Sequence, residues 1–259
     1  MAMNPRLLRP LATFDPDAAA YLRAVEAADG QALETPVKRA VDDFFKGCKA
    51  DGIWDAIKAS CILCGARTLA GALVPLAGTA PTNNNFVDAD YNRETGLVGN
   101  ATSKYLDSNR ANDADPQNDK HLAVYASTVG SGNQFYAASG VSGDTGLYNE
   151  SGTNFLGRIN RNSISTVVSG AGSATGLIAA ARTSSGTQQA RAGGATVTSS
   201  NEPNTYVSDN TGIFARIASG TVVNYSNARL AFYSIGESLD LALLDARVTA
   251  LVTAIGAAL

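Results

Sequence analysis

The segment Leu230–Leu259 constrains the fold most, because it joins a strand covered on both faces to an amphipathic helix. In Leu230–Ile235 both alternating faces are apolar, with Leu230 and Phe232 on one and Ala231, Tyr233 and Ile235 on the other. After Gly236, apolar residues recur at spacings of three and four: Leu241, Leu244, Val248, Leu251, Ile255 and Ala258. This spacing predicts a helix with one apolar face, which must be buried against another part of the structure.

The chain divides into three regions by composition. Residues 1–80 are rich in Ala and Leu with helical periodicity, residues 81–236 alternate short β-prone runs with turn residues, and residues 237–259 form the closing helix. Charged residues make up only 17% of the chain, below the usual share of about 25%. We therefore predict a mainly β protein, a jelly-roll sandwich flanked by N-terminal helices and a C-terminal helix.

The N-terminal region predicts three helices. Asp15-Pro16 begins the first, which ends at Gly30, and Thr35-Pro36 begins the second. A third helix is predicted where Ile53, Trp54, Ile57, Cys61 and Cys64 recur at helical spacing. We expect these helices to pack against the closing helix within one chain. The alternative is that the closing helix forms an intermolecular coiled coil.

Charge and hydropathy exclude several classes of protein. The net charge is −3 and Lys and Arg form no cluster, which argues against binding to nucleic acid. The sequence contains no run of about 18 apolar residues, so we expect no membrane span. The first residues contain no continuous apolar core of signal-peptide length, so secretion by that route is not expected.

Three cysteines and one histidine are the main candidates for metal or redox chemistry. Cys61 and Cys64 form a C-x-x-C pair, and a closed zinc site would also need Cys48 and His121. A thioredoxin-like motif would need a preceding strand, whereas this segment predicts a helix. We expect buried, reduced, structural cysteines. His121 opens the apolar run HLAVY and is expected to complete a strand end rather than act as a base.

The sequence offers little for catalysis. No nucleophile-elbow, phosphate-loop, dinucleotide or metalloprotease motif occurs. Asp88, Asp90 and Glu94 form the best set of carboxylates, at a spacing of two between the first pair, as a glycan-cleaving strand would need. The alternative for these three acids is a solvated loop that leads into a strand. No catalytic residue is therefore predicted, and the chain is expected not to be an enzyme.

Two further groups of residues are weak candidates for ligand binding. The polar segment 106–121 contains oxygen ligands that suit calcium, at Asp107, Asn109, Asp113, Asp115 and Asp119. It lacks the spacing of an EF-hand, and a solvated turn is the alternative. Tyr136, Tyr148 and Tyr206 lie in loop-like or edge contexts, where their rings could stack on sugars. Ordinary packing within a β domain is the alternative for the tyrosines.

Three stretches of the sequence resemble virion proteins of tailed bacteriophages. TPVKRAVDDFFKGCKADGIWDAIKASCILCGAR (35–67), with its core Lys49–Ile57, resembles their N-terminal helical signature. NRETGLVGNATSKYLDSNR (92–110), followed by NDKHLAVYAST, resembles the opening strands of their laminin-G or concanavalin-A-like jelly roll. ARLAFYSIGESLDLALLDARVTALVTAI (228–255) resembles their closing strand and helix. Residues 129–220 carry no such resemblance.

The resemblance implies a non-enzymatic structural protein of the virion, assembled in the host cytoplasm. The resemblance implies that the protein belongs to a tail-fibre, baseplate or neck appendage. Its expected partners are other virion proteins, and it could form a trimer. Host-surface glycans are candidate ligands. The alternatives are a capsid decoration (cement) protein, a glycan-cleaving depolymerase and a calcium-dependent lectin. The sequence departs from catalytic relatives of that fold in lacking their closely spaced Glu and Asp, so we assign no glycanase activity. We expect no cofactor, with calcium as the alternative.

Overall fold

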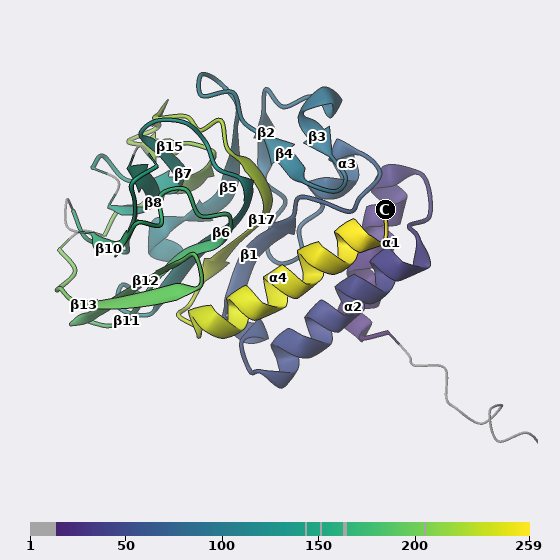
Figure 1. Cartoon of the computed structure of the whole chain (residues 1–259), viewed down its shortest axis with the longest axis horizontal. Helices are drawn as coiled ribbons and strands as arrows, with labels where there is room; N and C mark the ends of the chain where they lie inside the picture. The colour runs from purple at the N-terminus through teal and green to yellow at the C-terminus, as the bar shows by residue number, and fades with distance from the viewer. Residues whose placement is uncertain (1–13, 143, 151, 163–164, 205) are drawn as a thin grey trace, which may run out of the picture.

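The protein is a β sandwich with helices packed on one side of it (Figure 1). The computed structural model describes residues 14–142, 144–150, 152–162, 165–204 and 206–259. Within these residues two sheets lie face to face, almost wholly antiparallel, and enclose an apolar core. The predicted mainly β jelly-roll sandwich with helices at both ends of the chain is confirmed.

The two sheets have eight and nine strands. The eight-stranded sheet runs in the order β13-β12-β11-β6-β17-β4-β3, with β1 also paired to β17. Its strands are β1 (Ile57–Ile62), β3 (Tyr91–Asn92), β4 (Gly96–Val98), β6 (Lys120–Thr128), β11 (Gly176–Ser184), β12 (Thr187–Ala192), β13 (Ala195–Ser200) and β17 (Arg229–Gly236).

The nine-stranded sheet runs in the order β10-β9-β8-β7-β14-β5-β2, with the β15–β16 hairpin attached to β7. Its strands are β2 (Thr82–Asn84), β5 (Tyr105–Ala111), β7 (Gln134–Ser139), β8 (Thr145–Glu150), β9 (Asn154–Arg158), β10 (Thr166–Ser169), β14 (Asn210–Ile213), β15 (Arg216–Ala218) and β16 (Thr221–Val223). The β15–β7 pair is parallel. The helices are α1 (Pro16–Asp29), α2 (Thr35–Ala50), α3 (Leu69–Ala72) and α4 (Leu241–Ala257), with 3-10 turns η2 (Trp54–Ala56), η3 (Asp88–Asp90) and η4 (Asn112–Ala114).

Strand β17 lies at the centre of the eight-stranded sheet and is buried on both faces, as predicted. One edge pairs with β6, and the other pairs first with β4 and then with β1. A register shift between Leu230 and Phe232 interrupts the simple alternation. As a result Leu230 and Tyr233 face the interior of the sandwich, whereas Ala231 and Phe232 face the helices. The predicted pairing of Leu230 with Phe232 on one face was therefore wrong.

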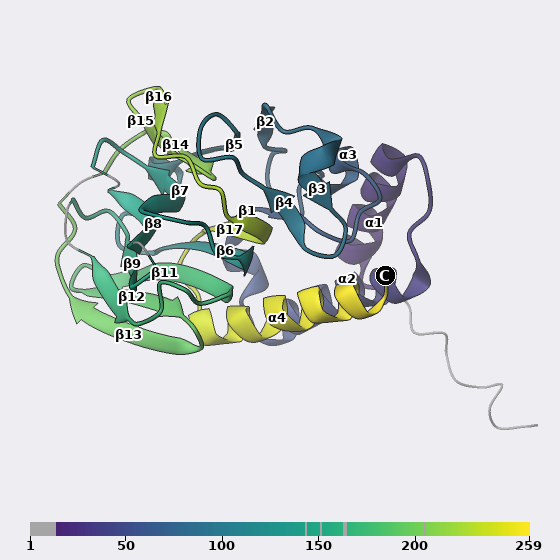
Figure 2. The same cartoon turned by 45° about the horizontal axis from the view of Figure 1, so that its top comes forward.

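Helices α2 and α4 lie side by side against the outer face of the eight-stranded sheet (Figures 1 and 2). The rings of Phe44 on α2 and Phe232 on β17 are 6.0 Å apart between centroids. Arg247 on α4 forms a two-pronged ion pair with Asp51 after α2, at 2.6 and 2.9 Å. The apolar face of the closing helix is thus covered within the chain, as predicted. Within the described residues, none of the helices has the length and apolar character needed to cross a membrane.

The predicted third helix is wrong, because the segment that contains it forms η2 and then β1. Gly52, at φ +70°, ends α2 in a backbone conformation that favours glycine. Ile57 and Ile62 then face the helices, whereas Ala59 and Cys61 face the interior of the sandwich. Because β1 is covered on both faces, it carries apolar residues on both, and periodicity alone cannot distinguish such a short strand from a buried helical segment. The eight-stranded sheet therefore begins before residue 80.

The three cysteines are free and buried. Cys64 belongs to the apolar cluster under the helices, whereas Cys61 belongs to the cluster inside the sandwich, where its Sγ lies 3.5 Å from the hydroxyl oxygen of Tyr233. Burial raises the pKa of Cys48, Cys61 and Cys64 to about 12. Because Cys61 and Cys64 face different clusters, the C-x-x-C pair does not present two thiolates to one ion.

His121 completes a strand end, as predicted. It lies on β6 and is fully buried. Its Nδ1 lies 2.6 Å from the carbonyl oxygen of Glu237, which can only accept, so Nδ1 carries the proton. Its Nε2 then accepts from the Ser234 hydroxyl at 2.7 Å. The ring is satisfied as the neutral form, and burial lowers the pKa of His121 to about 4.

This lowered pKa predicts a pH dependence of stability. In the unfolded chain the imidazole should titrate near its ordinary pKa of about 6.5. The unfolded state therefore binds more protons below that pH, and the contribution of His121 to the free energy of unfolding should fall as the pH drops from about 6.5 to about 4, by about 3 kcal/mol in all. Because the chain has a single histidine, its imidazole NMR signals report this directly. They should stay those of the neutral ring at pH 5.5, and a titration midpoint near pH 6.5 would contradict the burial described.

The seam between α4 and the rest of the fold allows a matched mutational test. Leu251 is 2% exposed and Leu243 is 37% exposed, and both lie on α4. Leu251→Ala should lower the free energy of unfolding by about 3 kcal/mol, because it opens a cavity at the seam. Leu243→Ala should change it by less than about 1 kcal/mol. Urea unfolding followed by circular dichroism measures both, and equal effects of the two substitutions would show that α4 does not pack as described.

Candidate functional site

Two aromatic rings and two arginines gather on the nine-stranded sheet, on the face that points away from the eight-stranded sheet. We call Phe135, Tyr148, Arg158 and Arg216 the ring–arginine cluster. Phe135 on β7 pairs directly with Tyr148 on β8, and their ring centroids are 4.9 Å apart at an interplanar angle of 54°. The guanidinium carbon of Arg216 on β15 lies 5.6 Å from the centroid of the Phe135 ring, a cation–π contact.

Strand alternation explains why these side chains point outward. Leu147 on β8 and Gly157 on β9 are paired and face the interior. A Cβ on Gly157 would lie 2.8 and 3.0 Å from the methyl carbons of two alanines in the eight-stranded sheet. The next residues along these strands, Tyr148 and Arg158, therefore point to the opposite face. Phe135 belongs to neither apolar cluster of the core, consistent with an outward orientation.

The two guanidinium groups are held by backbone and hydroxyl oxygens. Arg158 donates from Nε to Ser165 Oγ at 2.6 Å and from a terminal nitrogen to the Ser142 carbonyl at 2.8 Å. Arg216 donates to the carbonyl oxygen of Val141. Its Nε is buried and has no hydrogen-bond partner within the described residues. Both side chains are therefore oriented without using all of their donors.

The electrostatics of the cluster favour an anion. Burial lowers the pKa of Arg158 and of Arg216, and each also feels the buried carboxylate of Asp144, which acts in the opposite direction. The charge of Arg216 lowers the pKa of Arg158 further, so the two groups are close enough to repel. Two partly desolvated cations thus share one nearby carboxylate. An additional carboxylate, sulfate or phosphate from a ligand would relieve this repulsion.

Of the three tyrosines predicted to meet sugars, one lies in the cluster. Tyr148 is half-buried on β8, with its ring against Phe135. Tyr136 is 1% exposed and points into the core from β7, so its predicted loop-like context was wrong and its ring cannot stack on a ligand. Tyr206 is exposed elsewhere, and its hydroxyl donates to the carbonyl oxygens of Asp113 and Asp115 at 3.0 and 2.5 Å.

The sequence did not single out Phe135, Arg158 and Arg216. The run NQFYAAS on β7 predicts alternation, but not whether Phe135 or Tyr136 points outward. Arg216 joins the cluster only because β15 pairs in parallel with β7, where Arg216 lies opposite Ala138. Nothing local in the sequence marks that pairing.

The predicted calcium ligands are directed to separate protein partners. Asp107 accepts the backbone N–H of Asn109 at 2.8 Å, and Asn109 donates to the Ala80 carbonyl at 2.8 Å. Asp115 pairs with Arg110 at 2.9 Å, Asp119 accepts the N–H of Ser238 at 2.8 Å, and Asp113 is exposed on η4. In the part of the chain that the structure describes, no group of three or more His, Cys, Asp or Glu side chains could hold a metal ion.

The predicted carboxylate set does not share one face of a strand. Asp88 and Asp90 lie on the 3-10 turn η3, and Glu94 lies in the turn after β3. Asp90 is bound by Lys104 at 2.5 Å and accepts the N–H of Val87 at 2.9 Å. The alternative of a loop leading into a strand agrees with this geometry, and the spacing of two places no pair of carboxylates across a cleft.

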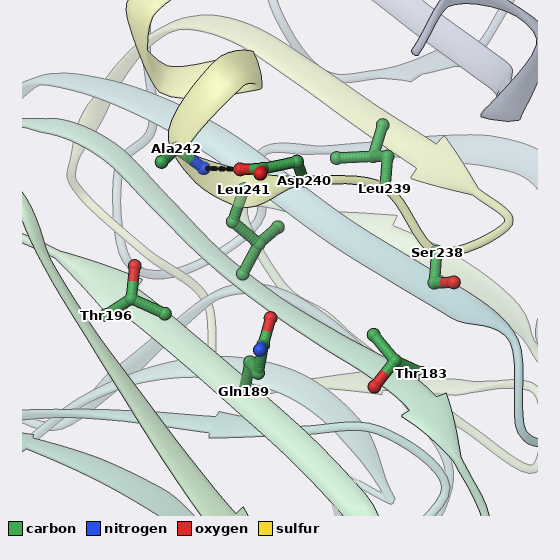
Figure 3. A pocket seen from close by; sticks show the side chains of 8 residues that line it. All are labelled: Thr183, Gln189, Thr196, Ser238, Leu239, Asp240, Leu241 and Ala242. Carbon is green, nitrogen blue, oxygen red and sulfur yellow. Dashed lines mark hydrogen bonds between the residues drawn. The ribbon is translucent and has the colours of Figure 1, made fainter. Parts of the chain in front are cut away.

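A hollow of about 340 Å³ separates the start of α4 from β11, β12 and β13 (Figure 3). It is lined by Thr183, Gln189, Thr196, Ser238, Leu239, Asp240, Leu241 and Ala242. Asp240 uses one carboxylate oxygen to cap α4, accepting the N–H groups of Ala242 and Leu243 at 2.8 and 3.1 Å. No aromatic ring and no cation lines this hollow. It offers weaker recognition than the ring–arginine cluster.

Comparisons with known proteins give a fold but no family. No protein-family model and no curated protein matches the chain. Among solved structures, the binding domain of botulinum neurotoxin serotype D is similar with a TM-score of 0.50 at 10% identity, covering 76% of this chain and 51% of that one. The chain thus spans about half the length of that structure.

Two sialidase-related structures are also similar. A mutant of Trypanosoma rangeli sialidase that displays trans-sialidase activity has a TM-score of 0.49 at 10% identity, covering 84% of this chain and 39% of that one. The CBM40 of Ruminococcus gnavus IT-sialidase, bound to α2,3-sialyllactose, has a TM-score of 0.40 at 15% identity, covering 52% and 84%. At such identities likeness concerns architecture alone, because function resides in particular sites on a fold.

Proposed function

We propose that this chain is a non-enzymatic structural protein of a tailed-bacteriophage virion, an appendage of the tail fibre, baseplate or neck that binds an acidic host-surface glycan. The ring–arginine cluster is the observation that carries the glycan part. The virion part is supported by the sequence resemblance of both ends of the chain and of the first strands of the β region.

The chemistry of the cluster fits an acidic sugar. The half-buried Tyr148 ring offers an apolar surface for the C–H face of a pyranose ring, and Phe135, which is only 6% exposed, packs against that ring and holds it in place. Arg158 and Arg216 offer planar donors that match a carboxylate or a sulfate ester. A neutral sugar would use the Tyr148 ring but would leave the repulsion between the two guanidinium groups in place.

The location of the cluster suits a protein that is anchored on one side and binds on the other. Helices α2 and α4 cover the outer face of the eight-stranded sheet, and the cluster lies on the outer face of the nine-stranded sheet. Figure 2 shows α4 along one side of the molecule and the β15–β16 hairpin on the opposite side. The helical side could contact neighbouring virion proteins while the cluster faces the host surface.

Substitutions in the cluster should weaken binding to acidic oligosaccharides. Candidate ligands are found on an array that contains sialylated, uronate-containing, sulfated and neutral glycans, and affinities are measured by calorimetry. Tyr148→Ala should weaken binding about tenfold, because it removes the more accessible of the two rings. Arg158→Gln should weaken binding of the acidic ligand by at least about tenfold, because it removes a charge-assisted contact.

The matched control is Arg39→Gln, which changes an exposed arginine on α2 by the same substitution. It should leave the affinity unchanged. Binding that prefers neutral glycans, or that survives both cluster substitutions, would contradict the proposed site. The absence of new reducing ends after incubation with a bound polysaccharide is the expected result for a protein without glycanase activity.

The virion part has a separate test. Immunogold labelling of purified phage particles with antibodies to this protein should mark the tail or neck. Label spread over the head would instead indicate a capsid decoration protein. If the protein is missing from purified particles, the virion assignment fails, whether or not the protein binds a glycan.

A further inference from the structure

Trp54 separates two adjoining hollows on the helical side of the molecule, away from the ring–arginine cluster. The first, of about 350 Å³, is lined by Asp17, Lys49, Gly52, Trp54 and Asp55. The second, of about 390 Å³, shares Asp17 and Trp54 and is otherwise lined by Ala20, Tyr21, Ala24, Phe45, Pro75 and Leu76. The first hollow is thus lined mainly by charged residues, whereas most side chains that line the second are apolar or aromatic.

The fold fixes Trp54 between the two hollows. Its ring packs on Phe45 of α2, with centroids 4.5 Å apart. It comes directly after the turn at Gly52 and Ile53 that ends α2, and Ile53 is 4% exposed. Trp54 itself is half-buried, and its indole N–H has no acceptor within the described residues. A ring anchored in this way loses little conformational entropy when a partner binds to it.

The first hollow has an excess of negative charge. Lys49 is already engaged by Asp15 at 2.7 Å and by Asp17 at 2.6 Å. Asp55 is exposed and has no ion-pair partner among the described residues. The carboxylates of Asp17 and Asp55 thus line this hollow together with a single ammonium group, which Asp15 also binds, beside an aromatic ring. This arrangement is complementary to a cation, through the carboxylates and through the face or edge of the indole.

The lining of the second hollow favours a peptide over a sugar as the ligand. A sugar would need several hydrogen-bonding side chains there, but beyond the shared rim the hollow is lined by alanines, a proline, a leucine, a phenylalanine and one tyrosine. An apolar side chain fits this lining better. We propose that the two hollows form a docking site for a peptide segment of a partner protein, in which a lysine or arginine lies next to an apolar residue.

In this arrangement the cationic side chain enters the acidic hollow and the apolar side chain enters the other hollow, with the peptide crossing Trp54. The site lies on the helical side of the sandwich, where α1 and α2 meet η2. It does not depend on glycan binding, and it would serve attachment to a neighbouring protein.

Trp54 is the only tryptophan in the chain, so its fluorescence reports occupancy of this site directly. The probe is an acetylated and amidated four-residue peptide of alternating leucine and lysine, titrated into the full-length protein. We expect a saturable change in Trp54 fluorescence. Added salt should weaken the binding of the peptide, because it screens exposed charges. A peptide with glutamate in place of lysine should give no response.

Asp55→Asn should weaken binding of the basic peptide about threefold, as expected for loss of one exposed charge contact. Glu202→Gln, at an exposed acid that follows β13 far from α1, should not change it. Equal responses to the basic and acidic peptides, a fluorescence response only to neutral oligosaccharides, or no response to the basic peptide at millimolar concentration would each overturn the proposal. The circular dichroism spectrum of Asp55→Asn should match that of the unchanged protein, which shows that weaker binding does not result from misfolding.

Discussion

The rest of the structure depends on β17, which is buried on both faces and paired along both edges. Its pairing with β6 builds the centre of the eight-stranded sheet, and its pairing with β1 and β4 ties the N-terminal half of the chain to the C-terminal end. Phe232 meets Phe44 of α2 on one face, and Tyr233 enters the interior of the sandwich on the other. The helices are thereby fixed to one outer face of the sandwich.

The proposed glycan site depends on the outer face of the nine-stranded sheet. Because α2 and α4 pack on the other sheet, the ring–arginine cluster lies on a face that they do not cover. Its side chains are carried by regular strands, so they need little reordering to receive a ligand. The helical side, with Trp54 at the junction of α1, α2 and η2, is free for a different contact. The proposed binding of a host-surface glycan and the proposed attachment to a particle would then use opposite sides of the protein.

Patterns within single elements made much of this fold predictable. The spacing in Leu241–Ile255 predicted α4 and its buried face, and Asp-Pro and Thr-Pro predicted where α1 and α2 begin. The same reasoning failed at β1, because Ile57–Ile62 is covered on both faces and its periodicity fits a helix equally well. It also failed at the bulge in β17, which turns Phe232 to the face opposite Leu230.

Long-range topology limited what could be predicted of the site. Tyr148 was a candidate from the sequence, but Tyr136 was an equal one, and only the register of β7 separates them. The polar segment 106–121 was predicted as a solvated turn or a calcium loop. Instead, Asn112, Asp115 and Lys120 are buried, with Lys120 donating to the carbonyl oxygen of Asn112. Burial lowers the pKa of Lys120 to about 8. Asn160, from a distant part of the chain, accepts from the Asn112 amide and donates to the carbonyl oxygen of Gln117, both at 2.8 Å, and the local sequence does not mark these contacts.

The central claim is that an acidic glycan binds on the outer face of the nine-stranded sheet, and amide NMR of the isotopically labelled protein tests it most directly. Titration with an acidic oligosaccharide that the protein binds should shift the resonances of β7, β8, β9 and β15 around Phe135, Tyr148, Arg158 and Arg216, while those of α2 and α4 stay in place. Shifts concentrated instead around the hollow at the start of α4, or around Trp54, would contradict the account.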